Sequence, residues 1–123
     1  FLLGIYSPDQ LHGHPLRGSI FETFIYTELY KTIAHQNLPF QIFFFRDYAG
    51  HEVDFVIDTG SDVRLIEAKA SATFNSDQLN GIRYASTLFP SSTAGYLLYA
   101  GSDSFTHQGK QIKSWTNVEA CLT

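Results

Sequence analysis

Apolar side chains recur at helical spacing in the first part of this chain. Residues 18–36 fit a helix with Ser19 as N-cap and Glu22 as its capping-box partner, ended by Asn37-Leu38-Pro39. On a wheel of about 100° per residue, Glu22 falls in the middle of the main apolar stripe. The other members of this stripe are Ile25, Tyr26, Leu29 and Ile33, and a second arc of Phe21 and Phe24 widens it. Glu22 is therefore predicted to face the core.

Strand-like patterns follow this helix. Residues 41–47 are mostly apolar and predict a buried strand, whereas residues 52–58 and 63–69 alternate between two faces. One face of the second run carries Val53, Phe55 and Ile57, and one face of the third carries Val63, Leu65, Glu67 and Lys69. Turn residues at 48–51 and 59–62 predict that the three strands form an antiparallel meander.

The second half of the chain predicts one more helix and further strands. A helix is expected over 77–89, an apolar central strand over 94–100, an edge strand over 111–115 and a last helical turn over 117–122. The buried positions expected on the helix are Leu79, Ile82, Ala85, Leu88 and Phe89. The predicted fold class is α/β, a helix, a three-strand meander, a crossover helix and further strands, in one domain over 1–123.

Composition narrows the function classes. With 44% apolar and 15% aromatic residues, disorder is excluded, and a net charge of −4 gives no footprint for tight autonomous nucleic-acid binding. The single cysteine, Cys121, excludes a disulfide framework and a cysteine-built zinc site. No apolar run is long enough for a membrane span, so we expect a cytoplasmic protein. His12 and His14, in a predicted loop, are interpreted as loop residues and not ligands.

Methionine is missing from the sequence altogether. Translation starts with methionine, so we expect this chain to be a piece of a longer protein.

Candidate chemistry is concentrated in the hairpin over 52–69. Its four-residue loop makes the numbers of facing residues sum to 121, which sets Asp54 across from Glu67. Opposed side chains lie about 4.5–5.5 Å apart at Cβ, so these carboxylates repel, which a purely structural sheet avoids. Lys69 points to the same side, and Glu22 lies on the buried stripe of the helix. Three acids and a lysine are thus predicted to converge.

A divalent cation, Mg²⁺ or Mn²⁺, explains this cluster. Hard cations take carboxylate oxygens as ligands and keep several waters. A cation between Asp54 and Glu67 converts their repulsion into attraction and lowers the pKa of a bound water. Lys69 is then placed to orient that water or to stabilise charge on a phosphate.

Each of these residues also has a purely structural interpretation. Glu22 can act only in the capping box, and Asp54 and Glu67 can lie on a solvated face. Lys69 can simply neutralise Glu67. A slip of one residue in the hairpin register removes the pairing altogether.

Several sequence blocks resemble known families. The D-x12-E-A-K spacing from Asp54 to Lys69 resembles the PD-(D/E)xK phosphodiesterase signature, with Val53 in place of its proline. More closely, residues 1–90 resemble the C-terminal domain of unknown function that follows the ATPase module in many bacterial and archaeal AAA-type ATPases. The blocks that carry this resemblance are GSIFETFIYTELYK (18–31), FRD (45–47), EVDFVI (52–57) and IEAKAS (66–71).

The resemblance implies a restriction-endonuclease-like core and a set of site residues. Glu22, Asp54 and Glu67 would be metal ligands, and Lys69 would be the catalytic lysine. Gln78, early in the second helix, would contact the metal or the substrate. Arg46 and His51, which flank the predicted strands of the site, are further candidates for phosphate contact, or ordinary residues beside a turn.

The function implied is a Mg²⁺- or Mn²⁺-dependent phosphodiesterase that acts on DNA or RNA. An AAA-type ATPase module in cis would hold ATP, because this chain has no phosphate-binding loop. That module, or an oligomer, would supply the grip on nucleic acid. The alternative is a catalytically silent nuclease-fold domain that serves regulation, oligomerisation or partner docking.

Overall fold

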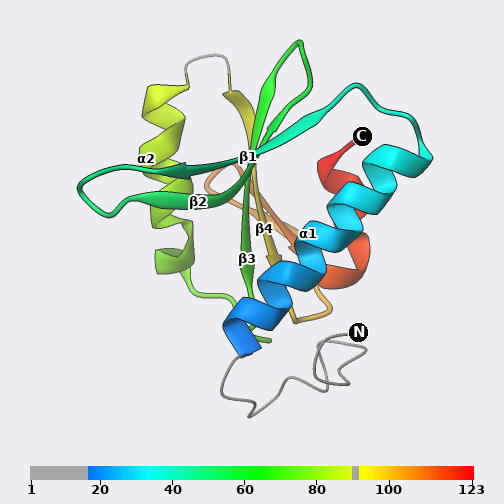
Figure 1. Ribbon diagram of the computed structural model, residues 1–123. Coiled ribbons are helices and arrows are strands. Elements are labelled where there is room, and N and C mark those ends of the chain that lie inside the picture. Colours follow the sequence, from blue (N-terminus) through cyan, green and yellow to red (C-terminus); the bar gives the residue numbers. More distant parts are fainter. Residues whose placement is uncertain (1–16, 90–91) are drawn as a thin grey trace.

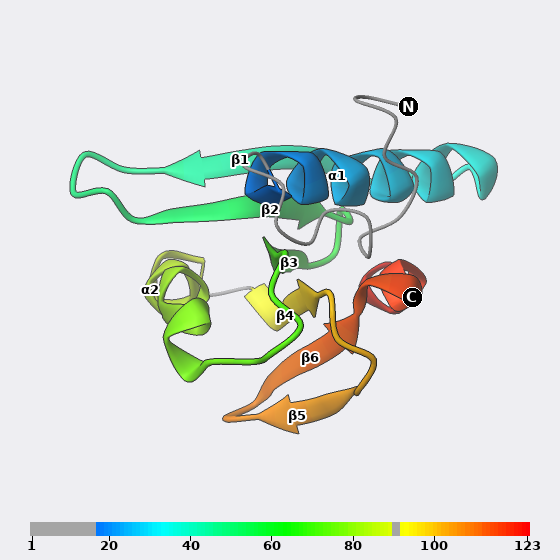
Figure 2. The ribbon, with the colours of Figure 1, turned by 90° about the horizontal axis from the view of Figure 1, so that it is seen from below.

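A computed structural model describes residues 17–89 and 92–123 of the chain. Helices cover both faces of a single mixed sheet (Figures 1 and 2). The elements are α1 (Arg17–His35), β1 (Gln41–Arg46), β2 (Glu52–Asp58), β3 (Val63–Lys69), η3 (Ser76–Leu79), α2 (Asn80–Leu88), β4 (Ser92–Tyr99), β5 (Phe105–His107), β6 (Lys110–Ser114) and η4 (Trp115–Cys121). The predicted fold class and its order of helix, meander, helix and further strands are therefore confirmed.

The sheet has six strands in the order β1-β2-β3-β4-β6-β5. The meander β1-β2-β3 is antiparallel, as predicted, and α2 crosses over to join the parallel pair β3 and β4. Helix α1 and the C-terminal η4 lie on one face, and α2 lies on the other (Figure 1). Strand β4 is central because β3 and β6 pair with it on either side.

Two apolar clusters fill the space between the helices and the sheet. The α1-side cluster is built on Phe21, Ile25, Leu29, Phe55, Ile57, Ile66 and Leu98. The α2-side cluster is built on Val53, Val56, Leu65, Leu79, Ile82, Ala85, Leu97 and Ile112. Strand β3 contributes to both, because its successive side chains alternate between the faces as the sequence predicts.

The first helix differs from the expectation in two ways. Ser19 and Glu22 both lie inside α1, so Ser19 is not its N-cap and no capping box forms there. Tyr26, predicted to be in the buried stripe, is 39% exposed, whereas Phe21 is fully buried. The helix therefore turns its Phe21–Ile25–Leu29 side to the sheet, and Glu22 lies at the margin of the buried stripe.

Strand β1 is an edge strand and is largely exposed, so the prediction that it is buried is wrong. Phe43 and Phe44 are 47% and 71% exposed, although both sit in an apolar run. An apolar run alone does not distinguish a central strand from an edge strand.

Three details of the second half also differ from the sequence reading. Of the helix positions expected in the core, Leu79, Ile82 and Ala85 are buried, but Leu88 is 48% exposed and Phe89, just after α2, is only partly buried. Strand β6, expected at the edge, is flanked by β4 and by the short β5, which the sequence did not predict.

Among the described residues, no helix is both long enough and apolar enough to cross a bilayer.

The hairpin register agrees with the prediction over most of its length. Pairs run from Asp58 with Val63 to Phe55 with Ile66, so paired numbers sum to 121. Against β1, strand β2 gains one extra residue, because Phe43 pairs with Val56 but Phe45 pairs with Val53. This bulge puts Val53 on the α2 side together with Val56, so the predicted Val53–Phe55–Ile57 face does not form.

Candidate functional site

The ladder between β2 and β3 gives way to side-chain hydrogen bonds where the acids lie. The last regular pair is Phe55 with Ile66, one position short of the predicted Asp54–Glu67 pair. There the Asp54 backbone N–H donates to Glu67 Oε1 at 3.1 Å, and the Ala68 N–H donates to Asp54 Oδ2 at 2.8 Å. Each carboxylate therefore accepts a hydrogen bond from the backbone of the opposite strand, and the two residues do not form a regular cross-strand pair.

Close packing of α2 buries this end of the hairpin. A Cβ on Gly81 would lie 2.2 Å from the Glu52 carbonyl oxygen and 3.6 Å from Glu67 Oε1. Only glycine allows the helix to approach this closely. As a result Glu67, on the α2 side of β3, is only 5% exposed.

Lys69 lies beside the buried acid, as the strand alternation predicts. Its Nζ is 3.5 Å from Glu67 Oε2, and its side chain is 41% exposed. The Lys69 ammonium group thus forms an ion pair with Glu67 and remains accessible to solvent.

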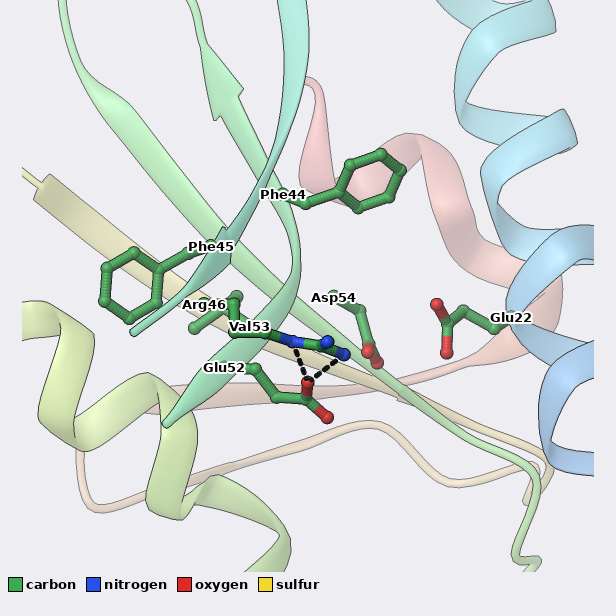
Figure 3. A pocket seen from close by; sticks show the side chains of 7 residues that line it. All are labelled: Glu22, Phe44, Phe45, Arg46, Glu52, Val53 and Asp54. Carbon is green, nitrogen blue, oxygen red and sulfur yellow. Dashed lines mark hydrogen bonds and ion pairs between the residues drawn. The ribbon is translucent and has the colours of Figure 1, made fainter. Parts of the chain in front are cut away.

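Glu22 approaches the pair from α1. Figure 3 shows its carboxylate and that of Asp54 turned toward one another across the space between α1 and β2. Burial raises the pKa of Glu22, and the charges of Asp54 and Glu52 raise it further. Asp54 therefore lies between two other acids, one on α1 and one on β3.

Electrostatics at the site favour protonation in the absence of a cation. Burial, followed by the charge of Asp54, raises the pKa of Glu67 from 4.5 to about 8. Burial also raises the pKa of Asp54, and the hydrogen bond from Ala68 offsets part of that effect. Three neighbouring carboxyl groups with raised pKa values are typical of functional sites, since a purely structural core avoids them.

Two cavities open on this acidic group and share Glu52. The first, of about 310 Å³, is the Glu22–Asp54 cavity, lined by Glu22, Phe44, Phe45, Arg46, Glu52, Val53 and Asp54 (Figure 3). The second, of about 230 Å³, is the Glu67–Lys69 cavity, lined by Gly50, His51, Glu52, Glu67, Lys69, Asp77, Gln78, Asn80 and Gly81. The hairpin end therefore presents its acids to solvent on both sides.

The two secondary candidates are placed in different cavities. Arg46 lines the Glu22–Asp54 cavity, where its Nε and Nη2 donate to Glu52 Oε2 at 3.2 and 3.0 Å. Gln78 lines the Glu67–Lys69 cavity, and its Oε1 accepts from the Asn75 N–H at 3.0 Å in the cap of η3. Gln78 keeps its amide N–H groups for another partner.

Carboxylate oxygens such as those of Asp54 and Glu67 suit a hard divalent cation, but the third predicted ligand, Glu22, does not complete a three-residue site with them. Asp54 and Glu67 each accept a backbone N–H with one oxygen, and the second oxygen of Glu67 lies 3.5 Å from Lys69 Nζ. Over residues 17–89 and 92–123, no three His, Cys, Asp or Glu side chains come close enough to hold one metal ion. A cation here would take two carboxylates and complete its shell with water, as Mg²⁺ commonly does.

Sequence reasoning missed Glu52 and the residues that pack around the β1–β2 turn. Glu52 lines both cavities, and its position two residues before Asp54 was the available signal. Asp47 and Tyr84 form a cluster with His51, which a tertiary contact between the turn and α2 creates. No local sequence pattern predicts the contact between this turn and α2. His12 and His14 lie outside the described residues.

Comparisons with known proteins come from a family model and a solved structure. The model described as "Domain of unknown function (DUF4143)" matches residues 17–118. No curated protein matches the sequence. A similar chain belongs to a structure described as a refined half-complex from the tetradecameric assembly of Thermococcus gammatolerans McrB AAA+ hexamers with bound McrC. It is 17% identical, with a TM-score of 0.48, and the match covers 79% of this chain and 27% of that one.

Proposed function

This chain belongs to the DUF4143 family, and we propose that it is a metal-dependent phosphodiesterase domain that acts on nucleic acid. The observation that carries the proposal is the Asp54–Glu67 contact. The buried Glu67 carboxylate and the half-buried Asp54 carboxylate each accept a hydrogen bond from the other's strand. They do so beside an ammonium group, where two cavities open. Without a cation this arrangement costs stability, since burial and mutual repulsion oppose both charges.

The residues divide the proposed chemistry between them. Asp54 and Glu67 would hold the cation, which supplies a Lewis acid that activates water at neutral pH. Glu22, next to Asp54, completes the acidic set on the α1 side. Lys69, half exposed and adjacent to Glu67, donates to a phosphate oxygen as negative charge develops on it. Gln78 and Arg46 contact the substrate from the two cavities.

The rest of the proposed machine lies outside this chain. A net charge of −4 leaves few lysine and arginine side chains for phosphate contacts, so the domain by itself holds nucleic acid weakly. We therefore propose that an AAA-type ATPase module in cis, with its ATP, or an oligomer supplies the grip. We also propose a cytoplasmic location for this assembly and a restriction-endonuclease-like core as the scaffold of the domain.

One assay tests the proposed activity. The full-length protein is incubated with plasmid and Mn²⁺, and wild type is compared with Lys69→Ala and with Lys31→Ala. Lys31 is an exposed lysine on α1 that pairs with Glu28, so it controls for loss of one surface charge. Nicking is expected for wild type and Lys31→Ala and is expected to fall to background for Lys69→Ala. Equal background in all three overturns the proposal.

One observation favours the alternative, a catalytically silent domain for regulation or docking. Glu22, Asp54 and Glu67 do not come close enough together to bind one ion, so the described residues contain no complete three-ligand site. A silent domain has no reason to bind Mn²⁺ at Asp54, and its melting temperature would not respond to the ion. A rise in melting temperature that requires Asp54 excludes it.

A further inference from the structure

A tight turn between β1 and β2 fixes an imidazole in place. Asp47 Oδ1 accepts from the backbone N–H groups of Ala49 and His51 at 3.1 and 2.9 Å, and the Asp47 N–H donates to the His51 carbonyl at 3.0 Å. The second oxygen, Asp47 Oδ2, lies 3.2 Å from His51 Nδ1. One carboxylate thus holds both the backbone and the ring of His51.

Helix α2 holds the other side of the ring. The rings of His51 and Tyr84 are stacked, with centroids 3.7 Å apart and planes at 8°. An interaction with the Asp47 side chain also raises the pKa of the Tyr84 hydroxyl. Tyr84 is itself fixed because its neighbours on α2, Ile82 and Ala85, are buried in the core. Two elements far apart in the sequence therefore determine the orientation of His51.

The imidazole lines a cavity that it shares with part of the proposed catalytic group. His51 lines the Glu67–Lys69 cavity, and its side chain is 41% exposed. The turn that carries it is only three residues from Asp54. A cavity of about 230 Å³ has room for water and for part of a substrate next to the ring.

The contact with Asp47 defines which ring nitrogen is available. Desolvation works against ionisation of Asp47, but hydrogen bonds from His51 and Tyr84 together hold its pKa below the ordinary value. An ionised carboxylate only accepts, so His51 Nδ1 carries the proton in this contact. In the neutral ring Nε2 then has a free lone pair, which is the arrangement that a carboxylate gives to a histidine base.

Resting on the proposed function, we propose that His51 is a further catalytic residue, the base of the hydrolysis, and that Asp47 and Tyr84 are its positioning residues. His51 Nε2 takes a proton from the attacking water as an O–H bond breaks. The electron pair of that bond becomes the new bond from oxygen to phosphorus. The ester P–O bond breaks, and its electron pair leaves with the departing oxygen, which takes a proton from solvent.

Other charged groups face the same cavity and belong to its pH response. They are Glu52 and Glu67 on the strands flanking the turn, Lys69 on β3, and Asp77 on η3, in addition to Asp47 and Tyr84. None of these is replaced in the variants of His51, so a change in the pH profile that follows from His51 alone is separable from them.

The test uses the full-length protein with Mn²⁺ and an oligonucleotide substrate. His51→Gln is expected to lower kcat about 100-fold with KM unchanged, in line with the usual contribution of a general base. The pH dependence that Glu67 gives to kcat is expected to remain in this variant. Asp47→Asn, as a second variant that keeps the side-chain shape, is expected to lower kcat at least about tenfold. His35→Gln, at the exposed end of α1, is the matched control and is expected to leave kcat unchanged.

The outcomes separate the two proposals. Wild-type kcat in His51→Gln overturns the role of His51 and leaves the phosphodiesterase intact. A lower melting temperature in His51→Gln with kcat unchanged below it also overturns that role, because it shows a structural histidine. Absence of Lys69-dependent cleavage in wild type overturns both proposals.

Discussion

Leu65 and Glu67 are two residues apart on the same face of β3, and both are buried under α2. The backbone around them differs, because Leu65 lies within the regular β2–β3 ladder and Glu67 lies beyond its end. Leu65 is fully buried at the regular end of the β2–β3 hairpin, within an apolar cluster and a continuous ladder. Glu67 is 5% exposed at the other end, where the ladder stops and its side chain replaces a backbone acceptor. One end of the hairpin supplies stability and the other holds charge at the expense of stability.

This contrast separates what holds the fold from what the fold presents. The regular end needs only apolar side chains of suitable volume, because burial supplies its free energy. The polar end needs particular atoms, because a buried carboxylate is tolerated only with specific donors. Substitutions at the two ends are therefore expected to differ in how much they change the free energy of unfolding, in pH dependence and in the response to cations.

The largest effect is expected at the regular end. Leu65→Ala is expected to lower the free energy of unfolding by about 2–5 kcal/mol, because it leaves a cavity in the α2-side cluster. Urea unfolding of the chain measures the change. Leu88→Ala is the matched control, since Leu88 is 48% exposed, and it is expected to change stability by less than about 1 kcal/mol. Similar losses in both variants contradict the contrast.

Cation binding is expected to act only on the polar end. Mn²⁺ at about 100 times its Kd is expected to stabilise the wild-type chain by about 2.7 kcal/mol, seen as a rise in melting temperature. Asp54→Asn is expected to lose this rise. Asp58→Asn, at the regular end of the same strand, is expected to keep it, because Asp58 Oδ1 only accepts from the Gly60 N–H in the turn. A rise that persists in Asp54→Asn places the ion elsewhere.

Per pH unit, the pH dependence of stability is expected to be smaller than these two effects, and it is expected to come from Glu67. Its folded pKa of about 8 is above the unfolded 4.5, so its stabilisation is complete below pH 4.5 and is lost as the pH rises through 8. The free energy of unfolding is expected to fall by up to about 1.4 kcal/mol per pH unit in this window. Glu67→Gln is expected to flatten the curve. Glu28→Gln, on the surface of α1, is the control that leaves the slope in place.

The smallest effect is expected for the surface ion pair beside the site. Arg46 and Glu52 pair at 3.0 Å, but their side chains are 79% and 54% exposed. Arg46→Ala is expected to change stability by less than about 1 kcal/mol, because solvent screens exposed pairs. Thermal unfolding checks this value. A larger loss would mean that the polar end contributes to the stability of the fold after all.

The alternation along β3 and the hairpin register could be predicted from the sequence. Both follow from the two-residue period of a strand and from a short turn at 59–62. The exposure of β1 and the three-residue strand β5 could not, because a strand's neighbours are decided by tertiary pairing. The bulge in β2 was missed for the same reason, since it depends on how β1 pairs with β2.

The candidate site was predictable to the extent that it is local. The closeness of Asp54 and Glu67 was expected from the register, but the regular ladder ends one pair earlier and side-chain hydrogen bonds to the backbone bring the two acids together. The closeness of Lys69 to Glu67 follows from alternation. The depth of their burial depends on Gly81 approaching the Glu52 carbonyl, which is a contact between distant segments. The Asp47–His51–Tyr84 cluster depends on such a contact as well, so sequence reasoning found only the single residue His51 beside a turn.

The linkage between the two carboxylates spans only 13 residues of chain. Loops of this length close within about a microsecond, well before segments as distant as α1 and the C-terminal η4 find each other. We therefore expect Asp54 and Glu67 to meet early on the folding pathway, while water still screens their repulsion, and to become desolvated only when α2 docks. Their electrostatic penalty would then fall on the late steps of folding, and protons or cations that relieve it would speed those steps.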